Sequence, residues 1–190
     1  MYHAHRYNPL PSEGRFDNNA VMRRLIVAAS LFAVSLATTT AQADESIIKT
    51  PGDHPNYRFE AEPHGLLGYG GPFVHGRGDL GAGFRGTVII LDNGFVKTIN
   101  NSVGIGFGGD IFFRSGTFFI PVVMQWNFWL TTHWSVFGEP GVGFAANTGL
   151  DRDVFHLTAY LGGRYHFNDR ISLTLRLGYP SLSVGASFFL

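Results

Sequence analysis

Apolar residues occupy every second position along most of this chain, with small or polar residues between them. The stretch 171–179, ISLTLRLGY, shows this most clearly, because its odd positions are all apolar and its even positions are Ser, Thr, Arg and Gly. A period of two residues is typical of a β-strand with one apolar and one polar face. No stretch after residue 44 has a sustained helical period. The sequence therefore predicts an all-β fold.

Turn-forming residues divide this pattern into eight segments. The separators include Gly-Gly-Pro at 70–72, Asp-Asn-Gly at 92–94 and Asn-Asp at 168–169, residue types that tolerate tight turns or positive φ. Short strands at such even spacing are typical of a β-sandwich or a barrel. The predicted strands are approximately 57–67, 82–90, 103–113, 119–130, 134–144, 155–165, 171–179 and 182–190.

The charged residues within these segments all lie on the face opposite the apolar one. A charge on the lipid-facing side of a membrane strand costs about 2–4 kcal/mol for Arg or Lys at mid-bilayer, so a face without charges suits lipid. The charged positions comprise four bases and four acids, which can neutralise one another in a closed lumen: Arg58, Glu60, Glu62, Arg85, Asp110, Glu139, Arg164 and Arg176.

Alternation alone fits two architectures, a soluble barrel or sandwich with its apolar face inward and a membrane barrel with that face in lipid. The polar face is rich in Gly, Ser and Thr, whereas a solvated surface would carry Lys and Glu. Aromatic residues gather toward the segment ends, as in the girdles of membrane barrels: Tyr57, Tyr69, Phe113, Phe128, Trp134, Phe155, Tyr165, Phe167, Tyr179 and Phe188. We therefore predict an eight-stranded, antiparallel, up-and-down transmembrane β-barrel.

The N-terminal part of the chain predicts export. Residues 22–45, MRRLIVAASLFAVSLATTTAQADE, contain two arginines, an apolar run too short to span a bilayer comfortably, and Ala-Gln-Ala at 41–43. This is the pattern of a cleaved signal peptide, and an uncleaved membrane-anchoring helix is the alternative. The predicted organisation is an untranslated extension at 1–21, a signal peptide at 22–43, a periplasmic lead-in at 44–56 and the barrel at 57–190.

The charge and the cysteine content exclude one class of partner and two sources of stability. Cleavage after residue 43 would leave 147 residues with ten bases and twelve acids, a net charge near −2. This balance argues against nucleic acid as a partner, because no basic patch exists to meet phosphates. The chain contains no cysteine, so neither disulfides nor thiolate metal sites support it. A closed, hydrogen-bonded barrel in lipid is another source of stability for an exported chain.

The last segment carries a family resemblance. LSVGASFFL at 182–190 places Leu182, Val184, Ala186, Phe188 and Leu190 on one face. It resembles the C-terminal signal of bacterial outer-membrane barrels of the small eight-stranded class (OmpA transmembrane domain, OmpX and OmpW-like), over residues 55–190. The resemblance implies outer-membrane localisation, contact with outer-membrane lipid, and recognition of this strand by the barrel assembly machinery. One departure is that the family usually ends in Phe, whereas this chain ends in Leu190.

Motifs for nucleotides and metals have weaker support. The pattern G-x-G-x-x-G occurs at 81–86 and 104–109, but inside alternating strands and without the following helix that a phosphate site needs. Glycine there allows a narrow barrel to curve. Histidines lack metal-ligand spacing; His156 and His166, for example, would lie roughly 33 Å apart on one strand. We predict neither a cofactor nor a metal.

The strongest candidate for chemistry is Glu60, Glu62 and His64, which share the polar face of the first segment, successive members being about 6.6 Å apart. They could perform acid–base catalysis, and lipid A deacylases in the resembled class use a His and Ser pair, but no His-x-Ser occurs here. An ion-pair network with the four arginines is favoured, because buried charges must be paired and an eight-stranded barrel is only wide enough for its side chains.

The sequence thus predicts a monomeric, non-enzymatic envelope protein whose lumen is filled by ion pairs. A narrow gated channel, with the network as its gate, is the main alternative. A lipid-modifying enzyme using His64 with the adjacent glutamates ranks third, and a soluble, lipocalin-like ligand binder ranks fourth. The predicted surface connections at 114–117 and 180–181 are very short, so they offer little material for adhesion or receptor binding.

Overall fold

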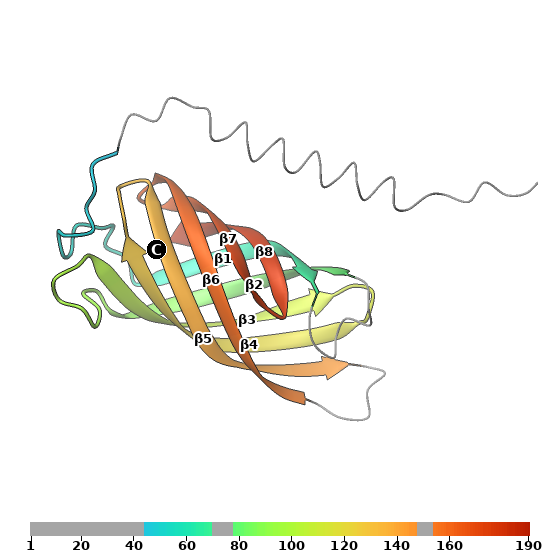
Figure 1. Ribbon diagram of the computed structural model, residues 1–190. Coiled ribbons are helices and arrows are strands. Elements are labelled where there is room, and N and C mark those ends of the chain that lie inside the picture. The colour runs from blue at the N-terminus through green and yellow to red at the C-terminus, as the bar shows by residue number, and fades with distance from the viewer. Residues whose placement is uncertain (1–43, 70–77, 148–153) are drawn as a thin grey trace, which may run out of the picture. The chain divides into compact units, whose positions relative to one another are not determined.

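The strands form one closed barrel. A computed structural model describes residues 44–69, 78–147 and 154–190. Each strand pairs antiparallel with its neighbours in sequence, and the last pairs with the first (Figure 1). The fold prediction is confirmed. The strands are β1 (Phe59–Gly68), β2 (Asp79–Leu91), β3 (Asn101–Phe112), β4 (Thr117–Trp129), β5 (Trp134–Asn147), β6 (Val154–Asn168), β7 (Ile171–Tyr179) and β8 (Ser181–Phe189).

Residues Asp44–Leu190 form one compact unit. The predicted extension at 1–21 and the predicted signal peptide at 22–43 both lie outside the described residues. Across the described ranges, no helix is long and apolar enough to cross a membrane.

The seam between β1 and β8 is closed by the last residue of the chain. The two strands pair from Glu60 opposite Phe189 to Gly68 opposite Ser181. Beyond this ladder, the Leu190 carbonyl accepts N–H bonds from residues 58 and 59 at 2.8 and 3.0 Å, and the Leu190 N–H donates to the carbonyl of residue 59 at 2.8 Å. The closed barrel therefore has no free sheet edge, which is the condition for a sheet in lipid.

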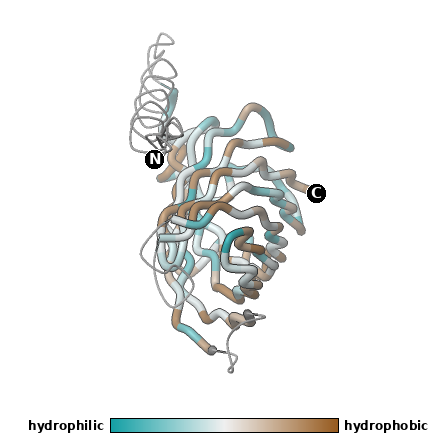
Figure 2. The backbone as a smooth tube through the Cα atoms, turned by 90° about the vertical axis from the view of Figure 1, so that its right-hand side faces the viewer, coloured by the Kyte–Doolittle hydropathy of each residue, from teal (hydrophilic) through white to brown (hydrophobic). Residues whose placement is uncertain are grey.

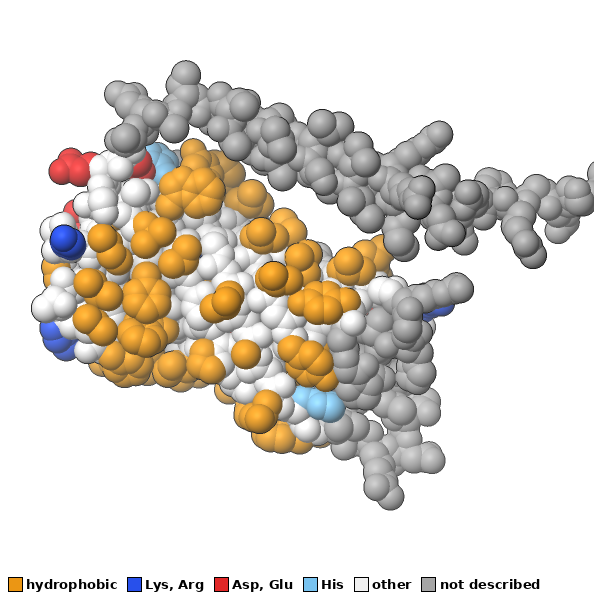
Figure 3. Space-filling view, viewed as in Figure 1, with side chains coloured by type: hydrophobic (Ala, Val, Ile, Leu, Met, Phe, Trp, Pro, Cys, Tyr) orange, Lys and Arg blue, Asp and Glu red, His pale blue; other side chains and the backbone are white. Residues whose placement is uncertain are grey.

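The apolar face of every strand points outward. Along the backbone, hydrophobic segments alternate with neutral or hydrophilic ones (Figure 2). In the space-filling view hydrophobic side chains cover the visible face of the barrel, and the charged side chains in view lie toward its ends (Figure 3). Large apolar side chains are strongly exposed, for example Leu157 at 79% and Leu161 at 73%. An aqueous surface of this kind would be unstable, so the soluble ligand-binding alternative is wrong and the outer face meets lipid.

Val103 departs from this arrangement. Its position predicts an outward side chain, but it is fully buried. The connection between β2 and β3 folds back over the outside of the barrel at this point. The Gly94 N–H donates to the Asn101 carbonyl at 2.8 Å, and a Cβ at Gly94 would lie 3.1 Å from Cγ2 of Val103. Glycine is thus what allows the connection to cover this side chain.

Tyr57 also lies elsewhere than predicted. It was assigned to the aromatic girdle, but it precedes β1, is buried, and contacts Trp129 and Phe189 at the mouth of the barrel. The other girdle aromatics that we predicted on the outer face are exposed or partly exposed in the structure. A side chain at the entry to the first strand can turn into the lumen because no partner strand fixes its direction.

The second strand begins earlier than predicted, at Asp79. Its carboxylate is buried, and its two oxygens accept the backbone N–H groups of Arg114 and Ser115 at 2.9 Å each. Asp79 therefore satisfies the backbone of the neighbouring β3–β4 connection, a role that alternation along one strand does not reveal.

Because the outer face meets lipid, a charge at mid-strand is expected to be far more costly than one near a strand end. Leu161 lies at the centre of β6, opposite Gly138 and Leu177. We expect Leu161→Arg to lower the free energy of unfolding by about 2–4 kcal/mol in phospholipid vesicles, and Phe155→Arg, near the end of the same strand, by about 0–1 kcal/mol. Denaturant titration measures both. Equal losses would contradict a lipid-facing surface.

Candidate functional site

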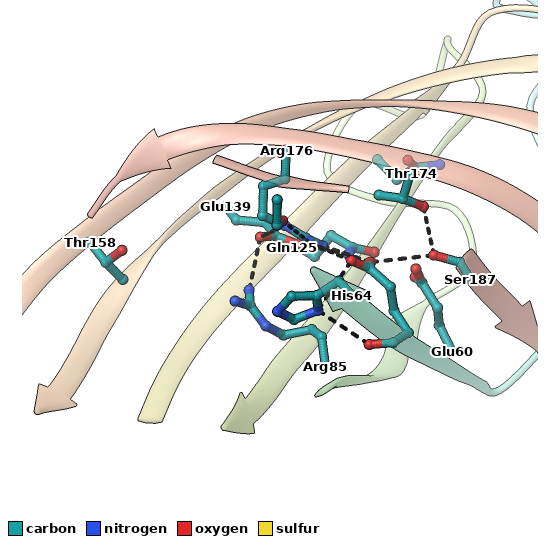
Figure 4. A network of polar contacts seen from close by, with 12 residues as sticks. Glu60, His64, Arg85, Gln125, Glu139, Thr158, Thr174, Arg176 and Ser187 are labelled. Atoms are coloured by element: carbon teal, nitrogen blue, oxygen red, sulfur yellow. Dashed lines mark hydrogen bonds and ion pairs between the residues drawn. The ribbon is translucent and has the colours of Figure 1, made fainter. Parts of the chain in front are cut away.

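Seven of the eight predicted lumen charges meet inside the barrel. Their side chains are at most 2% exposed, and they come from six different strands. The close-up shows Arg85, Glu139 and Arg176 of this group pointing toward one another from different strands (Figure 4). We call these residues, together with His64, the charged layer: Glu60, Glu62, Arg85, Asp110, Glu139, Arg164 and Arg176.

Arg176 on β7 is the centre of the charged layer. Its guanidinium donates to Glu62 through Nη1 and Nη2, at 2.6 and 3.0 Å, and to Glu139 through Nε and Nη2, at 2.8 and 3.2 Å. Paired hydrogen bonds of this type are the strongest that a guanidinium makes with carboxylates. Arg176 therefore joins β1, β5 and β7 across the lumen.

Glu139 has further donors on the opposite wall. Nη1 of Arg85 donates to Glu139 Oε2 at 3.1 Å, and the amide of Gln125 donates to Glu139 Oε1 at 2.9 Å. Arg85 also lies over the ring of Tyr160, 5.5 Å from its centroid. The buried carboxylate of Glu139 is thus surrounded by donors, as its desolvation requires.

A second group lies nearer the end of the barrel that carries the C-terminus. Nη2 of Arg164 donates to both oxygens of Glu60, at 2.7 and 2.8 Å, and Nη1 donates to the side-chain oxygen of Asn127 at 3.0 Å. The guanidinium also lies over the ring of Phe137, 4.3 Å from its centroid, a cation–π contact.

His64 pairs with Asp110 and not with a nucleophile. Its Nε2 lies 2.9 Å from Asp110 Oδ1, and its Nδ1 lies 3.6 Å from Glu62 Oε1. Arg85 lies 4.0 Å from the other Asp110 oxygen. Gly83 permits this close approach, because a Cβ there would collide with both His64 Nε2 and Asp110 Oδ1. One glycine of the G-x-G-x-x-G pattern therefore has a packing role.

Arg58 does not belong to the charged layer. It was predicted to point into the lumen, but it precedes β1 and its side chain is exposed. Its backbone is held by the seam, where its N–H donates to Leu190. The alternation of inward and outward side chains thus stops predicting their direction at the last residue before β1, because outside the barrel wall both faces meet solvent.

Apolar side chains close the lumen on both sides of the charged layer. On β1 and just before it, the inward order is Tyr57, the three charged-layer residues, and then Leu66. The loop-side apolar layer consists of Leu66, Phe112, Phe119 and Ala145. The terminus-side apolar layer consists of Ile47, Tyr57, Ile89, Trp129 and Phe189. The sequence did not predict these layers, because their members are far apart in the chain.

A serine and a histidine also meet in the lumen. Ser135 Oγ lies 2.9 Å from His166 Nε2, and the imidazole packs against the rings of Trp129 and Phe189. Both residues are at most 1% exposed, and His166 Nδ1 has no hydrogen-bond partner within the described part of the chain. The pair joins β5 and β6 across 31 residues of sequence, so no local motif could have identified it.

The histidines that we considered as metal ligands have other side-chain partners in the structure. Within residues 44–69, 78–147 and 154–190, no group of three or more His, Cys, Asp or Glu side chains is arranged to hold a metal ion. His133 instead contacts Asp44, at 2.8 Å, and His54 stacks on Trp129.

Removal of the central guanidinium tests the importance of the charged layer. Arg176→Met leaves two buried glutamates without their main partner, so we expect the free energy of unfolding to fall by about 3–5 kcal/mol. The same change at the exposed Arg58 is the matched control, with an expected change within about 0.5 kcal/mol. Urea titration in phospholipid vesicles compares the two. Similar small effects at both positions would mean that the ion pairs contribute little.

Comparison with known proteins gives similarity in fold alone. No protein-family model and no curated protein matches this chain. A de novo designed transmembrane β-barrel shares 14% identity over 75% of this chain and 99% of that chain, with a TM-score of 0.46. Ail of Yersinia pestis, crystallised with the heparin analogue sucrose octasulfate, shares 11% identity over 70% of this chain and 97% of that chain, with a TM-score of 0.47. Neisserial surface protein A shares 10% identity over 70% of this chain and 97% of that chain, with a TM-score of 0.46. At this similarity neither ligand nor activity can be transferred, and the fold assignment depends on the strand pairing of the chain itself.

Proposed function

We propose that this chain is an integral outer-membrane protein of the small eight-stranded class, with a sealed lumen and a non-enzymatic role in the envelope. The observation that carries this proposal is the sequence of three layers across the lumen. A fully paired charged layer lies between two apolar layers, and no charged side chain of the layer is left without an opposite partner. A barrel closed in this way acts through its presence in the membrane and its outer surface.

The layers argue against the channel alternative. An ion that crossed the lumen would have to displace Leu66 and the aromatic rings of Phe112 and Phe119, and then separate hydrogen-bonded ion pairs such as Arg176 with Glu62. Breaking a buried pair by removing one partner costs about 3–5 kcal/mol. The bonds of the charged layer therefore favour a filled lumen over a gate that opens readily.

The position of the catalytic candidates argues against a lipid-modifying enzyme. His64 and its neighbouring glutamates are buried and bonded to arginines and Asp110. Ser135 and His166 are at hydrogen-bond distance, but they are enclosed by the terminus-side apolar layer. A lipid outside the barrel has no route to either group, and a nucleophile must come within reach of its substrate.

The last strand supports membrane insertion by the barrel assembly machinery. The residues of the predicted assembly signal are exposed or partly exposed on β8 and at the residue that follows it: Leu182, Val184, Ala186, Phe188 and Leu190. The proposed partners are this machinery and outer-membrane lipid. We propose a monomer, because each strand already has two neighbours and no edge is left for a second chain.

Electrical recording tests the sealed lumen. We expect no unit conductance steps when the purified protein is inserted in a planar lipid bilayer, because both apolar layers exclude water. A porin added to the same bilayer is the positive control, and a boiling-dependent shift on a cold SDS gel shows that the inserted protein is folded. Reproducible unit steps from the folded protein would sink the sealed-lumen proposal and favour the channel.

Cell fractionation and lipid analysis test the other two parts of the proposal. We expect the protein in the outer-membrane fraction, and we expect the mass of lipid A to be the same with and without the protein. A changed lipid A mass would replace the structural role with an enzymatic one. Recovery from the inner membrane would contradict the proposed location.

A further inference from the structure

The segment before the barrel is folded against one end of it. Residues 44–57, here called the lid, cross the mouth between two connections, 92–100 and 130–133. The Ile47 N–H donates to the Leu130 carbonyl at 3.0 Å, and the Asn100 N–H donates to the Ile48 carbonyl at 2.7 Å. The lid is therefore held by the turns of the barrel and not by a strand ladder.

Apolar side chains of the lid fill the mouth of the lumen. Ile47 and Tyr57 are 7% and 5% exposed and pack with Trp129 and Phe189 in the terminus-side apolar layer. His54 stacks on the indole of Trp129, with ring centroids 5.2 Å apart and planes 9° apart. Trp129 is left fully buried beneath these side chains.

The start of the lid is fixed by an exposed carboxylate. Asp44 accepts hydrogen bonds from Nδ1 of His133 at 2.8 Å, from the His133 N–H at 3.1 Å, and from the Thr132 hydroxyl at 3.0 Å. The hydrogen bond from the His133 side chain is the main cause that lowers the pKa of Asp44 from 3.8 to about 2. The carboxylate therefore stays ionised, and this contact persists, well below neutral pH.

Polar groups lie directly beneath the lid. The Trp129 indole N–H donates to Ser102 Oγ at 3.4 Å. His166 Nδ1 and Arg164 Nε are buried and have no hydrogen-bond partner in the described residues. Buried polar atoms without partners lose hydration, and water that entered from this end would restore it. Two polar atoms beneath the lid would therefore gain hydrogen-bond partners if water entered from this end.

The lid has the features of a segment that opens locally. Residues 49–53 within it are exposed, and its only β-bridge to the barrel in the described structure is that of Ser46 with Thr131, beside single hydrogen bonds such as that from Asn100 Nδ2 to the Asp53 carbonyl at 2.7 Å. Segments with few buried apolar contacts and short pairing open at lower free energy than the strands of a barrel. Its docking surface comprises residues of β4 and β8, so it is complete only after the barrel has closed.

We propose that the lid is a movable seal on the terminus-side end of the lumen. When the lid is docked, it shields the side chains of Ser102, Trp129 and His166 from water. When it is displaced, a water-filled vestibule opens that ends at the Glu60–Arg164 pair of the charged layer. This adds a conformational device to the sealed barrel and does not require that the barrel conducts.

A single-cysteine reporter tests the seal, because the chain has no cysteine of its own. Ser102→Cys is placed in the folded protein in detergent micelles and reacted with a charged methanethiosulfonate reagent. Ile47→Ser removes an apolar anchor of the lid, and Ile48→Ser, the same change at the partly exposed neighbouring side chain, is the matched control. Ala145→Cys, in the loop-side apolar layer, reports on general opening of the barrel.

We expect Ile47→Ser to raise the labelling rate of Ser102→Cys at least tenfold, Ile48→Ser to leave it within about twofold, and Ala145→Cys to stay slow with both. The proposal is overturned if Ser102→Cys reacts rapidly with the lid intact. It is equally overturned if Ile47→Ser has no effect, or if Ala145→Cys accelerates in parallel. Planar-bilayer recording of Ile47→Ser distinguishes this proposal from the sealed-lumen one. We expect no conductance steps, because an open vestibule still ends at the charged layer.

A covalent lock covers the case in which Ile47→Ser does not fold. Ser46→Cys with Thr131→Cys joins the two bridge partners through a disulfide. We expect the oxidised form to slow hydrogen exchange of the Trp129 indole N–H, measured by NMR, relative to the reduced form of the same protein. The indole of the exposed Trp134 is the internal control. Equal exchange at Trp129 in both forms would show that the lid does not control access.

Discussion

The structure depends on the pairing of charged side chains that are buried inside the barrel. A buried carboxylate or guanidinium loses several kcal/mol of hydration, which is recovered only through close opposite charges and well-directed hydrogen bonds. Arg176 meets this condition with Glu62 and Glu139 together. These three residues lie on β7, β1 and β5, no two of which are adjacent in the wall. The ion pairs therefore hold the barrel across its interior, where the backbone ladder cannot.

The same charges also determine which way each strand faces. A shift of one residue in strand register moves every side chain to the opposite face. For β1 such a shift would place Glu60 and Glu62 in lipid and turn Leu67 into the lumen. The lipid outside the barrel and the ion pairs inside it thus both disfavour a one-residue shift. Together they specify one strand register. Within that register, Gly83 leaves the space in which His64 and Asp110 meet.

Alternation along the chain predicted the fold well because strand parity is a local property. It identified the eight strands and the inward direction of the charged positions, including Glu60, Glu62 and Arg176. It failed at Arg58 and Val103, because exposure there depends on where the wall begins and on a connection that folds back. The contact of Arg176 with Glu62 joins two non-adjacent strands, and the contact of Ser135 with His166 joins neighbouring strands at positions 31 residues apart, so both depend on strand pairing that no single segment encodes.

The two ends of the lumen are closed by different means, and this difference separates a fixed seal from a movable one. Leu66, Phe112 and Phe119 belong to the strands themselves, so the loop-side apolar layer cannot leave without unfolding of the wall. On the other side, Ile47 and Tyr57 lie outside the strands and complete a layer whose remaining members do belong to them. Within the described residues, a segment outside the strands closes this end alone, so water can be admitted there while the ion pairs and the barrel stay intact.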